Sequence, residues 1–79
     1  INIKCKLTQK IIKQHKYNKL KFLDASHNKN IYDVNHLANT LIELNCSGKD
    51  CGINQISISH LNNLEILNAK DNKSITSVN

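Results

Sequence analysis

Three stretches of the chain repeat one order of apolar and polar positions. In each, a leucine is followed by a second leucine, a small residue and a polar residue at fixed places. The stretches are Leu20-x-x-Leu23-x-Ala25-x-x-Asn28, Leu41-x-x-Leu44-x-Cys46-x-x-Lys49 and Leu64-x-x-Leu67-x-Ala69-x-x-Asn72, and an incomplete earlier copy runs through Ile3-x-Cys5-x-x-Thr8. A period of about twenty residues is typical of stacked structural repeats, so the pattern predicts a solenoid.

Each stretch also predicts a short strand. Side chains around the second leucine alternate between apolar and polar, which is the period of a strand. Consecutive strands that run the same way, with a long return between them, form a parallel sheet. We therefore expect one strand per repeat, with the sheet lining the inner, concave face of an arc.

The returning segments are expected to form the opposite, convex wall. Residues 8–19 are the best helix candidate, with Thr8 as the cap and the lysines toward solvent. Ile11, Ile12 and His15 would then point inward. The later returns are richer in Ser, Asn and β-branched residues, which favours turns and 3₁₀ segments. The apolar residues expected to pack the wall are Ile31, Val34, Leu37, Ile53, Ile56, Leu61, Ile75 and Val78.

The repeats make residues 1–79 a single module. Residues 1–19 form a partial repeat, 20–40 and 41–63 complete ones, and 64–79 another partial one, about three and a half in all. A chain of 79 residues is too short to build a second core. The expected fold class is an α/β solenoid, and the incomplete end repeats lead us to expect a fragment of a longer repeat protein.

The phrases LKFLDASHN, LIELNCSGK and LEILNAKDN give the chain a family resemblance. It resembles leucine-rich repeat proteins, of the Lys-, Asn- and Ile-rich kind found in AT-rich genomes such as giant DNA viruses, amoebae and low-GC bacteria. The resemblance implies a horseshoe-like arc that recognises another protein without catalysis. Lys49 departs from the family pattern, which has Asn at that place.

The polar residue at the ninth place has a structural purpose. The bend after each strand leaves backbone groups that a buried amide can satisfy, and Asn28 and Asn72 suit that role. Lys49 does not, because burying its charge would be costly. The only two glycines, Gly48 and Gly52, lie beside it, so we expect an irregular inserted loop at this rim.

The outward strand positions define a candidate recognition surface. Their columns are Asn2, Phe22, Glu43 and Ile66; Lys4, Asp24, Asn45 and Asn68; and Lys6, Ser26, Ser47 and Lys70. An aromatic and an aliphatic side chain ringed by polar groups resemble the composition of a protein interface. Isolated exposed apolar residues are also ordinary on any surface. The candidate partner-binding residues are Phe22, Asp24, Glu43, Asn45, Ile66 and Asn68.

An uneven charge distribution adds a second candidate surface. Seven lysines precede the first acidic residue, Asp24, whereas from there on four lysines meet six acids. A basic end of this kind can bind nucleic acid or another polyanion, although such lysines more often form a solvent-exposed surface that binds no ligand. The absence of arginine argues against base-specific readout. The candidate polyanion-binding residues are Lys4, Lys6, Lys10, Lys13, Lys16, Lys19 and Lys21.

The sequence offers little for catalysis or metal binding. We find no nucleophile with an identifiable base and no phosphate loop, so we expect neither enzyme activity nor a cofactor. Four histidines and three cysteines lack the familiar zinc-ligand spacings. His36 and His60 occupy equivalent repeat positions, so their rings are expected to lie together, and His27 is expected at the rim near a strand exit.

The cysteines favour a reducing compartment. Cys5 and Cys46 take the small inward place of the repeated phrase, where a free thiol packs as a small hydrophobe. Cys51 is close enough in sequence to meet Cys46. The odd cysteine count favours an intracellular location, the cytoplasm, or the host cytoplasm if the source is viral.

The open repeat ends predict self-association. End repeats without polar caps present core residues and unpaired strand groups. The candidate residues for this self-association are Ile1, Ile3 and Cys5 at one end, or Leu67, Ile75 and Val78 at the other.

No apolar run is long enough to span a membrane, so we expect no membrane partner.

Overall fold

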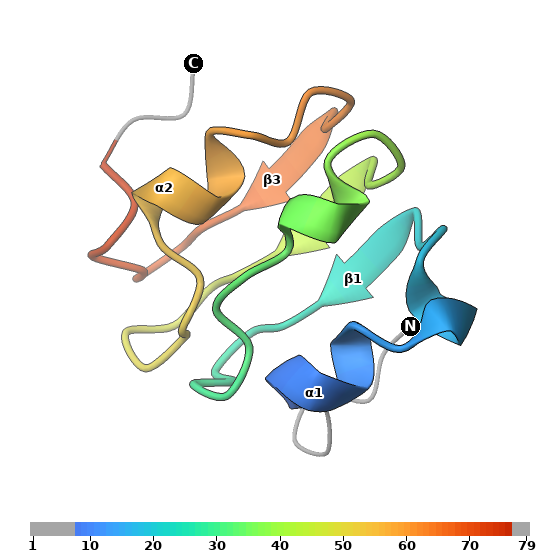
Figure 1. The fold of residues 1–79 in the computed structure, drawn as a ribbon. Helices are drawn as coiled ribbons and strands as arrows, with labels where there is room; N and C mark the ends of the chain where they lie inside the picture. The colour runs from blue at the N-terminus through green and yellow to red at the C-terminus, as the bar shows by residue number, and fades with distance from the viewer. Residues whose placement is uncertain (1–7, 77–79) are drawn as a thin grey trace.

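Three short strands form one layer of the structure, a computed structural model that describes residues 8–76. The strands are β1 (Phe22–Asp24), β2 (Glu43–Asn45) and β3 (Ile66–Asn68). They form one parallel sheet in the order β1-β2-β3 (Figure 1). Each strand is centred on the second leucine of its phrase, so the predicted parallel sheet is confirmed.

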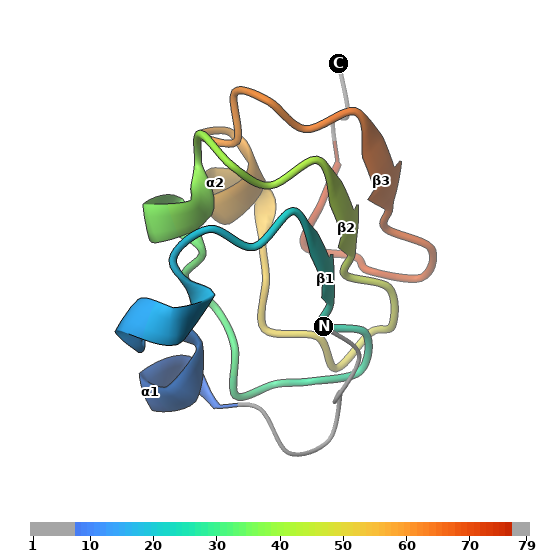
Figure 2. The ribbon, with the colours of Figure 1, turned by 90° about the vertical axis from the view of Figure 1, so that its right-hand side faces the viewer.

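Helical segments form the second layer. Figure 2 shows the strands on one side and the helical segments on the other, joined by loops at both ends. After β1 and again after β2, the chain crosses one end, passes through a helical segment and returns over the other end to the next strand. Each strand is thus brought beside the previous one in the same direction, which makes the sheet parallel.

The helical layer consists of short pieces rather than long helices. They are α1 (Gln9–Ile12), η1 (His15–Tyr17), η2 (Asn35–Leu37) and α2 (Gln55–Ile58), where η denotes a 3₁₀ helix. The predicted 3₁₀ character of the later returns is confirmed for η2, whereas the following return contains the short α-helix α2. Together the two layers make a small α/β unit with a radius of gyration of 11.0 Å.

The single helix predicted over residues 8–19 is wrong in its length. Thr8 does cap its start, because its Oγ1 accepts a hydrogen bond from Ile11 N at 3.3 Å. The helix ends after one turn, since Gln14 has an extended backbone with ψ 149°. Ile12 is buried as expected, but His15 is exposed because the interruption changes the direction in which the second turn faces.

The core lies between the two layers. Leu23 and Leu44 enter it from the sheet, with exposed fractions of 2% and 0%, and each such burial contributes about 1.5–3 kcal/mol. Of the predicted wall residues, Ile31, Val34, Leu37, Ile53 and Leu61 are buried, Ile75 is partly buried, and Val78 lies outside the described residues.

Ile56 is the wall residue that was predicted wrongly. Its side chain is 72% exposed, while Ser57 is 8% exposed. In the single turn of α2, Ser57 faces inward and its Oγ donates a hydrogen bond to Tyr32 O in the preceding return. The inward side of α2 is therefore formed by Ser57, through this hydrogen bond between returns, and by Ile58, which packs partly buried against the core.

Each strand is followed by a bend with the same backbone geometry. His27, Gly48 and Asp71 each follow the small inward residue by two places, and their φ angles are 58°, 102° and 62°. This left-handed region is open to glycine and tolerated by His and Asp more than by most residues. The three bends therefore share a left-handed residue at the same place after the strand despite their different sequences.

The predicted burial of the ninth-place asparagines is confirmed. Asn28 and Asn72 are each 5% exposed. Asn72 Nδ2 donates to Cys46 O at 2.8 Å and to Ile53 O at 2.9 Å, and its Oδ1 accepts from Ser74 N. A buried amide thus connects the bend to the preceding repeat unit, as the unpaired backbone groups there require.

In the middle phrase, Cys51 takes the place of the asparagine. Cys51 Sγ donates to Ala25 O at 3.2 Å, across the same sequence interval that separates Asn72 from Cys46. Lys49, the residue at the ninth place, is exposed. The inserted loop expected here is therefore two residues long, and it displaces the buried position from 49 to 51.

Candidate functional site

One row of exposed side chains crosses the three strands. Phe22, Glu43 and Ile66 are register partners on β1, β2 and β3. Phe22 is 56% and Ile66 54% exposed, and Glu43 is exposed as well. The next residues along the first two strands, Leu23 and Leu44, point into the core because strand side chains alternate between faces. The structure thus brings together the three described members of the first predicted column.

A second row lies one step further along the strands. Asp24, Asn45 and Asn68 are register partners, with Asn68 exposed and the other two partly buried. The outward surface formed by both rows is called the sheet face, and its residues are Phe22, Asp24, Glu43, Asn45, Ile66 and Asn68. All six candidate partner-binding residues therefore lie on one surface.

The second row also has a structural role that the sequence analysis missed. Asp24 Oδ1 accepts hydrogen bonds from Ser26 N and Ser26 Oγ, and Asn45 Oδ1 accepts from Ser47 N and Ser47 Oγ, at 2.7–3.1 Å. Asn68 Oδ1 accepts from Lys70 N at 3.1 Å. Each side chain thus closes a turn at its strand end.

The third predicted outward column is only partly correct. Ser26 is 4% exposed and Ser47 is partly buried, whereas Lys70 is exposed. The two serines follow the strand ends, where the chain already bends and their hydroxyls turn back to Asp24 and Asn45. Strand alternation does not extend past the last residue of a strand. Of the remaining column members, Asn2, Lys4 and Lys6 lie outside the described residues.

A histidine and a carboxylate meet at the rim where the strands end. His27 Nδ1 lies 3.1 Å from Asp50 Oδ1, and both side chains are more than half exposed. The imidazole lies against Gly48, where any Cβ would collide with Nδ1. The predicted rim position of His27 is confirmed. Gly48 is required both by its φ of 102° and by the ring beside it.

The candidate polyanion-binding lysines lie on the first turns and the approach to β1. Lys10, Lys13, Lys16, Lys19 and Lys21 are all exposed, while Lys4 and Lys6 lie outside the described residues. Lys13 Nζ is 3.4 Å from Asp33 Oδ2, and Lys16 Nζ is 5.2 Å from the centre of the Tyr17 ring. Two of the five cations are therefore already engaged by neighbours within the chain.

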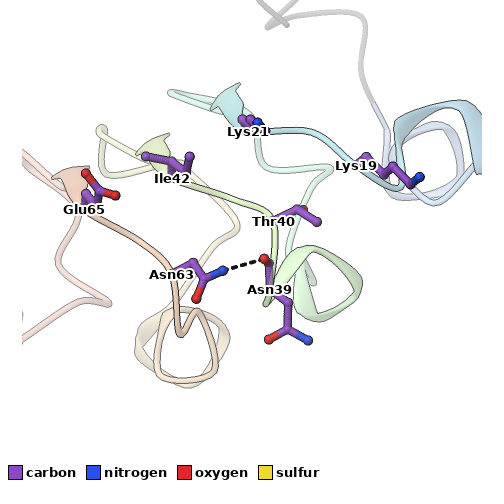
Figure 3. Close-up of a pocket in the computed structure, with 7 residues that line it drawn as sticks. All are labelled: Lys19, Lys21, Asn39, Thr40, Ile42, Asn63 and Glu65. Atoms are coloured by element: carbon purple, nitrogen blue, oxygen red, sulfur yellow. Dashed lines mark hydrogen bonds between the residues drawn. The ribbon is translucent and has the colours of Figure 1, made fainter.

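An open pocket of about 520 Å³ lies where the strands begin. Figure 3 shows Lys21, Ile42 and Glu65 side by side at the starts of the three strands, with Lys19 at one end. Asn63 Nδ2 donates to Asn39 O at 2.6 Å on the side of the pocket across from the strand starts. The lining carries both charge signs, and its members are Lys19, Lys21, Asn39, Thr40, Ile42, Asn63 and Glu65.

The two described cysteines are buried free thiols. Cys46 is 0% exposed, in the core position that was predicted for it, and Cys51 is 8% exposed. Burial raises the pKa of Cys46 to about 12. Burial also raises the pKa of Cys51, and hydrogen bonds from the backbone at Ile53 and Asn28 offset part of that rise. Both thiols stay protonated at neutral pH, which lets Cys51 act as a hydrogen-bond donor.

The equivalent histidines have different surroundings. His36 is half-buried and its Nε2 donates to Ile12 O at 2.9 Å, whereas His60 is exposed. The two positions thus differ in their contacts, because His36 has α1 beside it. Among residues 8–76, no group of three or more His, Cys, Asp or Glu side chains is placed to hold a metal ion.

The structural role of Cys51 was missed in the sequence. Cys51 was considered only as a possible neighbour of Cys46, and not as the residue that replaces a buried asparagine. The signal was available in the spacing, because Asn28 and Asn72 each follow the small inward residue by three places and Cys51 follows Cys46 by five. If two residues are treated as inserted before Cys51, Cys51 aligns with Asn28 and Asn72.

Comparisons of this chain with protein-family models, with curated proteins and with solved structures find no match. Within residues 8–76, the structure contains no helix with the length and apolar character required to cross a membrane.

Proposed function

We propose that this chain is a leucine-rich repeat module that binds a partner protein through the sheet face. The observation that carries the proposal is the registered row of Phe22, Glu43 and Ile66, which places two exposed apolar side chains on either side of a carboxylate. Such a mixture of apolar anchors and polar neighbours is typical of binding surfaces. A sheet with a packed core behind it holds the anchors in fixed positions.

The repeat assignment is supported by equivalence between the three phrases. Their second leucines, Leu23, Leu44 and Leu67, are register partners in the sheet. The bends that follow share a left-handed residue and a buried side chain, and in the second and third bends that side chain bonds the preceding unit. These correspondences support the proposal that the module is part of an α/β solenoid.

The size of the expected effect follows from the exposed area. Phe22 and Ile66 each have about half of their surface left to cover, so each contact would contribute on the order of 1 kcal/mol to binding. We expect the double substitution Phe22→Ala with Ile66→Ala to raise the Kd of the partner complex by at least about tenfold. Because both side chains are exposed, folding should be retained.

The test is capture of partners from a lysate of source cells with the immobilised module. A matched control is provided by Tyr32 and Ile56, which are 56% and 72% exposed but lie on the helical side. A protein retained by the wild type and by the Tyr32→Ala, Ile56→Ala variant, and lost with the Phe22→Ala, Ile66→Ala variant, would support the proposal. Equal capture by all three would refute it.

A basic surface for nucleic acid or another polyanion is the rival function. It is favoured by one observation: five exposed lysines, between Lys10 and Lys21, precede the first acidic residue. Binding of this kind would weaken steeply with added salt. Heparin affinity that is present at low salt and lost at high salt would favour it, and no retention at low salt would remove it.

A further inference from the structure

The sheet face is acidic in a basic protein. The strands and the residue before each of them comprise residues 21–24, 42–45 and 65–68, which contain one lysine against three carboxylates. The whole chain has a net charge of +5. Two of the carboxylates, Asp24 and Glu43, lie on the sheet face, and the third, Glu65, lines the pocket where the strands begin.

Glu43 has the central place in this arrangement. It lies on the middle strand, one strand away from Phe22 on one side and from Ile66 on the other, at spacings of about 4.8 Å between strands. Its side chain is exposed, and no ion pair for it is found among the residues that the structure describes. Asp24 differs, because its Oδ1 is engaged by Ser26.

We propose that the sheet face takes a polypeptide segment with an arginine or lysine beside an apolar side chain. The cation pairs with the Glu43 carboxylate, and the apolar side chain packs against Phe22 or Ile66. This inference rests on the proposed protein-binding function and names the chemistry of the partner. It follows from charge complementarity together with the registered positions of the three side chains.

The chemistry of the row suits such a cation. A guanidinium or ammonium group beside Glu43 is also within reach of an aromatic ring on the neighbouring strand, and aromatic rings attract cations as well as apolar groups. An exposed ion pair adds little affinity by itself. The apolar contacts therefore hold the segment, and the carboxylate selects among candidates by charge.

The same charges disfavour a polyanion on this surface. Phosphate groups would be repelled by Asp24, Glu43 and Glu65, whereas the exposed lysines between Lys10 and Lys16 belong to the helical layer. The six residues of the sheet face thus include two carboxylates and no lysine, with Lys21 and Lys70 beyond the strand ends. A basic partner segment on the sheet face is compatible with that charge.

The test is selection from a random-sequence peptide library displayed on phage, with the wild-type module as the target. Each selected peptide is then measured against the wild type, Glu43→Gln and the Phe22→Ala, Ile66→Ala variant. We expect peptides with Arg or Lys next to an apolar residue. Replacing the cation by Gln should weaken binding about two- to fivefold on the wild type and leave binding to Glu43→Gln unchanged.

A charge exchange makes the test independent of any single variant. Glu43→Lys should bind a selected peptide more weakly, and replacing the cation of that peptide by Glu should recover binding. Far-ultraviolet circular dichroism checks that each variant is folded. Recovery in the exchanged pair supports direct contact with position 43.

The remaining outcomes separate this inference from the proposed function. Two outcomes overturn the inference and leave the protein-binding proposal standing. In the first, the selected peptides need Phe22 and Ile66 but contain no required cation. In the second, replacing the cation weakens binding to Glu43→Gln as much as it weakens binding to the wild type. Peptides that bind the Phe22→Ala, Ile66→Ala variant as well as the wild type overturn both. A selection that enriches no peptide also overturns the inference.

Discussion

At the residue scale, the substitution of a thiol for an amide explains the irregular middle phrase. A buried backbone carbonyl needs a donor, and Ala25 O receives one from Cys51 Sγ as Cys46 O receives one from Asn72 Nδ2. The raised pKa of the Cys51 thiol, caused by burial, keeps the proton on the sulfur. A charged side chain such as Lys49 could not fill this place.

This role predicts a graded effect of substitutions at position 51. Cys51→Ala should lower the free energy of unfolding by about 1–2 kcal/mol, because it removes one of the two donors to Ala25 O, the other being Asn28 N, and leaves a small void. Cys51→Ser retains a donor and should cost less. Urea denaturation followed by circular dichroism measures both. Equal midpoints for Cys51→Ala and the wild type would contradict the role.

A second residue-scale prediction concerns pH. The pKa of Asp33 is lowered from 3.8, first by a hydrogen bond from the backbone of Asn35 and further by Lys13. Since the folded-state pKa lies below the unfolded one, Asp33 stabilises the fold above pH 3.8, and this contribution is lost as the pH falls through the folded-state value.

The comparison for this prediction is wild type against Asp33→Asn, which keeps an acceptor for Asn35 but removes the charge. The side chain is 35% exposed, so the difference should be under about 1 kcal/mol at neutral pH. It should disappear well below the folded-state pKa. A difference of the same size at both pH values in urea denaturation would show that the charge is not responsible.

At the element scale, the bends after the strands depend on residues that accept a left-handed backbone. Gly48→Ala should lower the free energy of unfolding by about 1 kcal/mol or more, because its φ is 102° and a Cβ would meet the His27 ring. In a His27→Ala background the collision is removed and only the backbone strain remains. The loss on Gly48→Ala should therefore be smaller there.

Thermal unfolding of the four variants in this cycle measures the coupling between His27 and Gly48. The expected result is a coupling term larger than the error of the measurement, since the two residues are in contact. If the stability losses of Gly48→Ala and His27→Ala are additive, the His27 ring moves aside at no cost, and close packing of His27 against position 48 would be wrong.

The strands show which side-chain directions could be predicted from the sequence. Alternation around the leucines correctly placed Leu23 and Leu44 inside and Phe22 and Ile66 outside, because successive side chains of a strand point to opposite faces of the sheet. It failed at Ser26, just beyond the strand end, where turn hydrogen bonds replace alternation.

The helical layer was less predictable because its pieces are single turns. One turn has too few residues to establish a helical period. Ile56 was therefore assigned inward although Ser57 holds that place, and His15 was assigned inward although Gln14 interrupts the helix. At Lys49 the fixed spacing of the phrase failed because an insertion displaces the buried position.

At the scale of the whole molecule, burial decreases toward β3. Leu44 and Cys46 of the middle strand phrase are 0% exposed, whereas Leu67 and Ala69, their register equivalents, are only partly buried. The sheet order β1-β2-β3 places β3 at an edge of the described sheet. Partly covered core residues beside a strand edge favour association.

We therefore predict concentration-dependent self-association through the β3 edge. Sedimentation velocity over a dilution series should show a species larger than the monomer at high concentration, and Leu67→Lys should remove it. Lys70→Ala, an exposed substitution near the same edge, is the control for a general loss of folding or charge. A monomer at every concentration would contradict the prediction.

The thiol at position 51 also has a consequence for altering the chain. Because the two additional residues are absorbed in front of Cys51, the loop tip at Lys49 and Asp50 can change length while the sheet and the buried bend keep their alignment. A fluorescent label or an affinity tag inserted between these two residues would sit on the solvent side of the rim. The loop tip at Lys49 and Asp50 is thus a suitable site for attaching a label, away from the hydrophobic core.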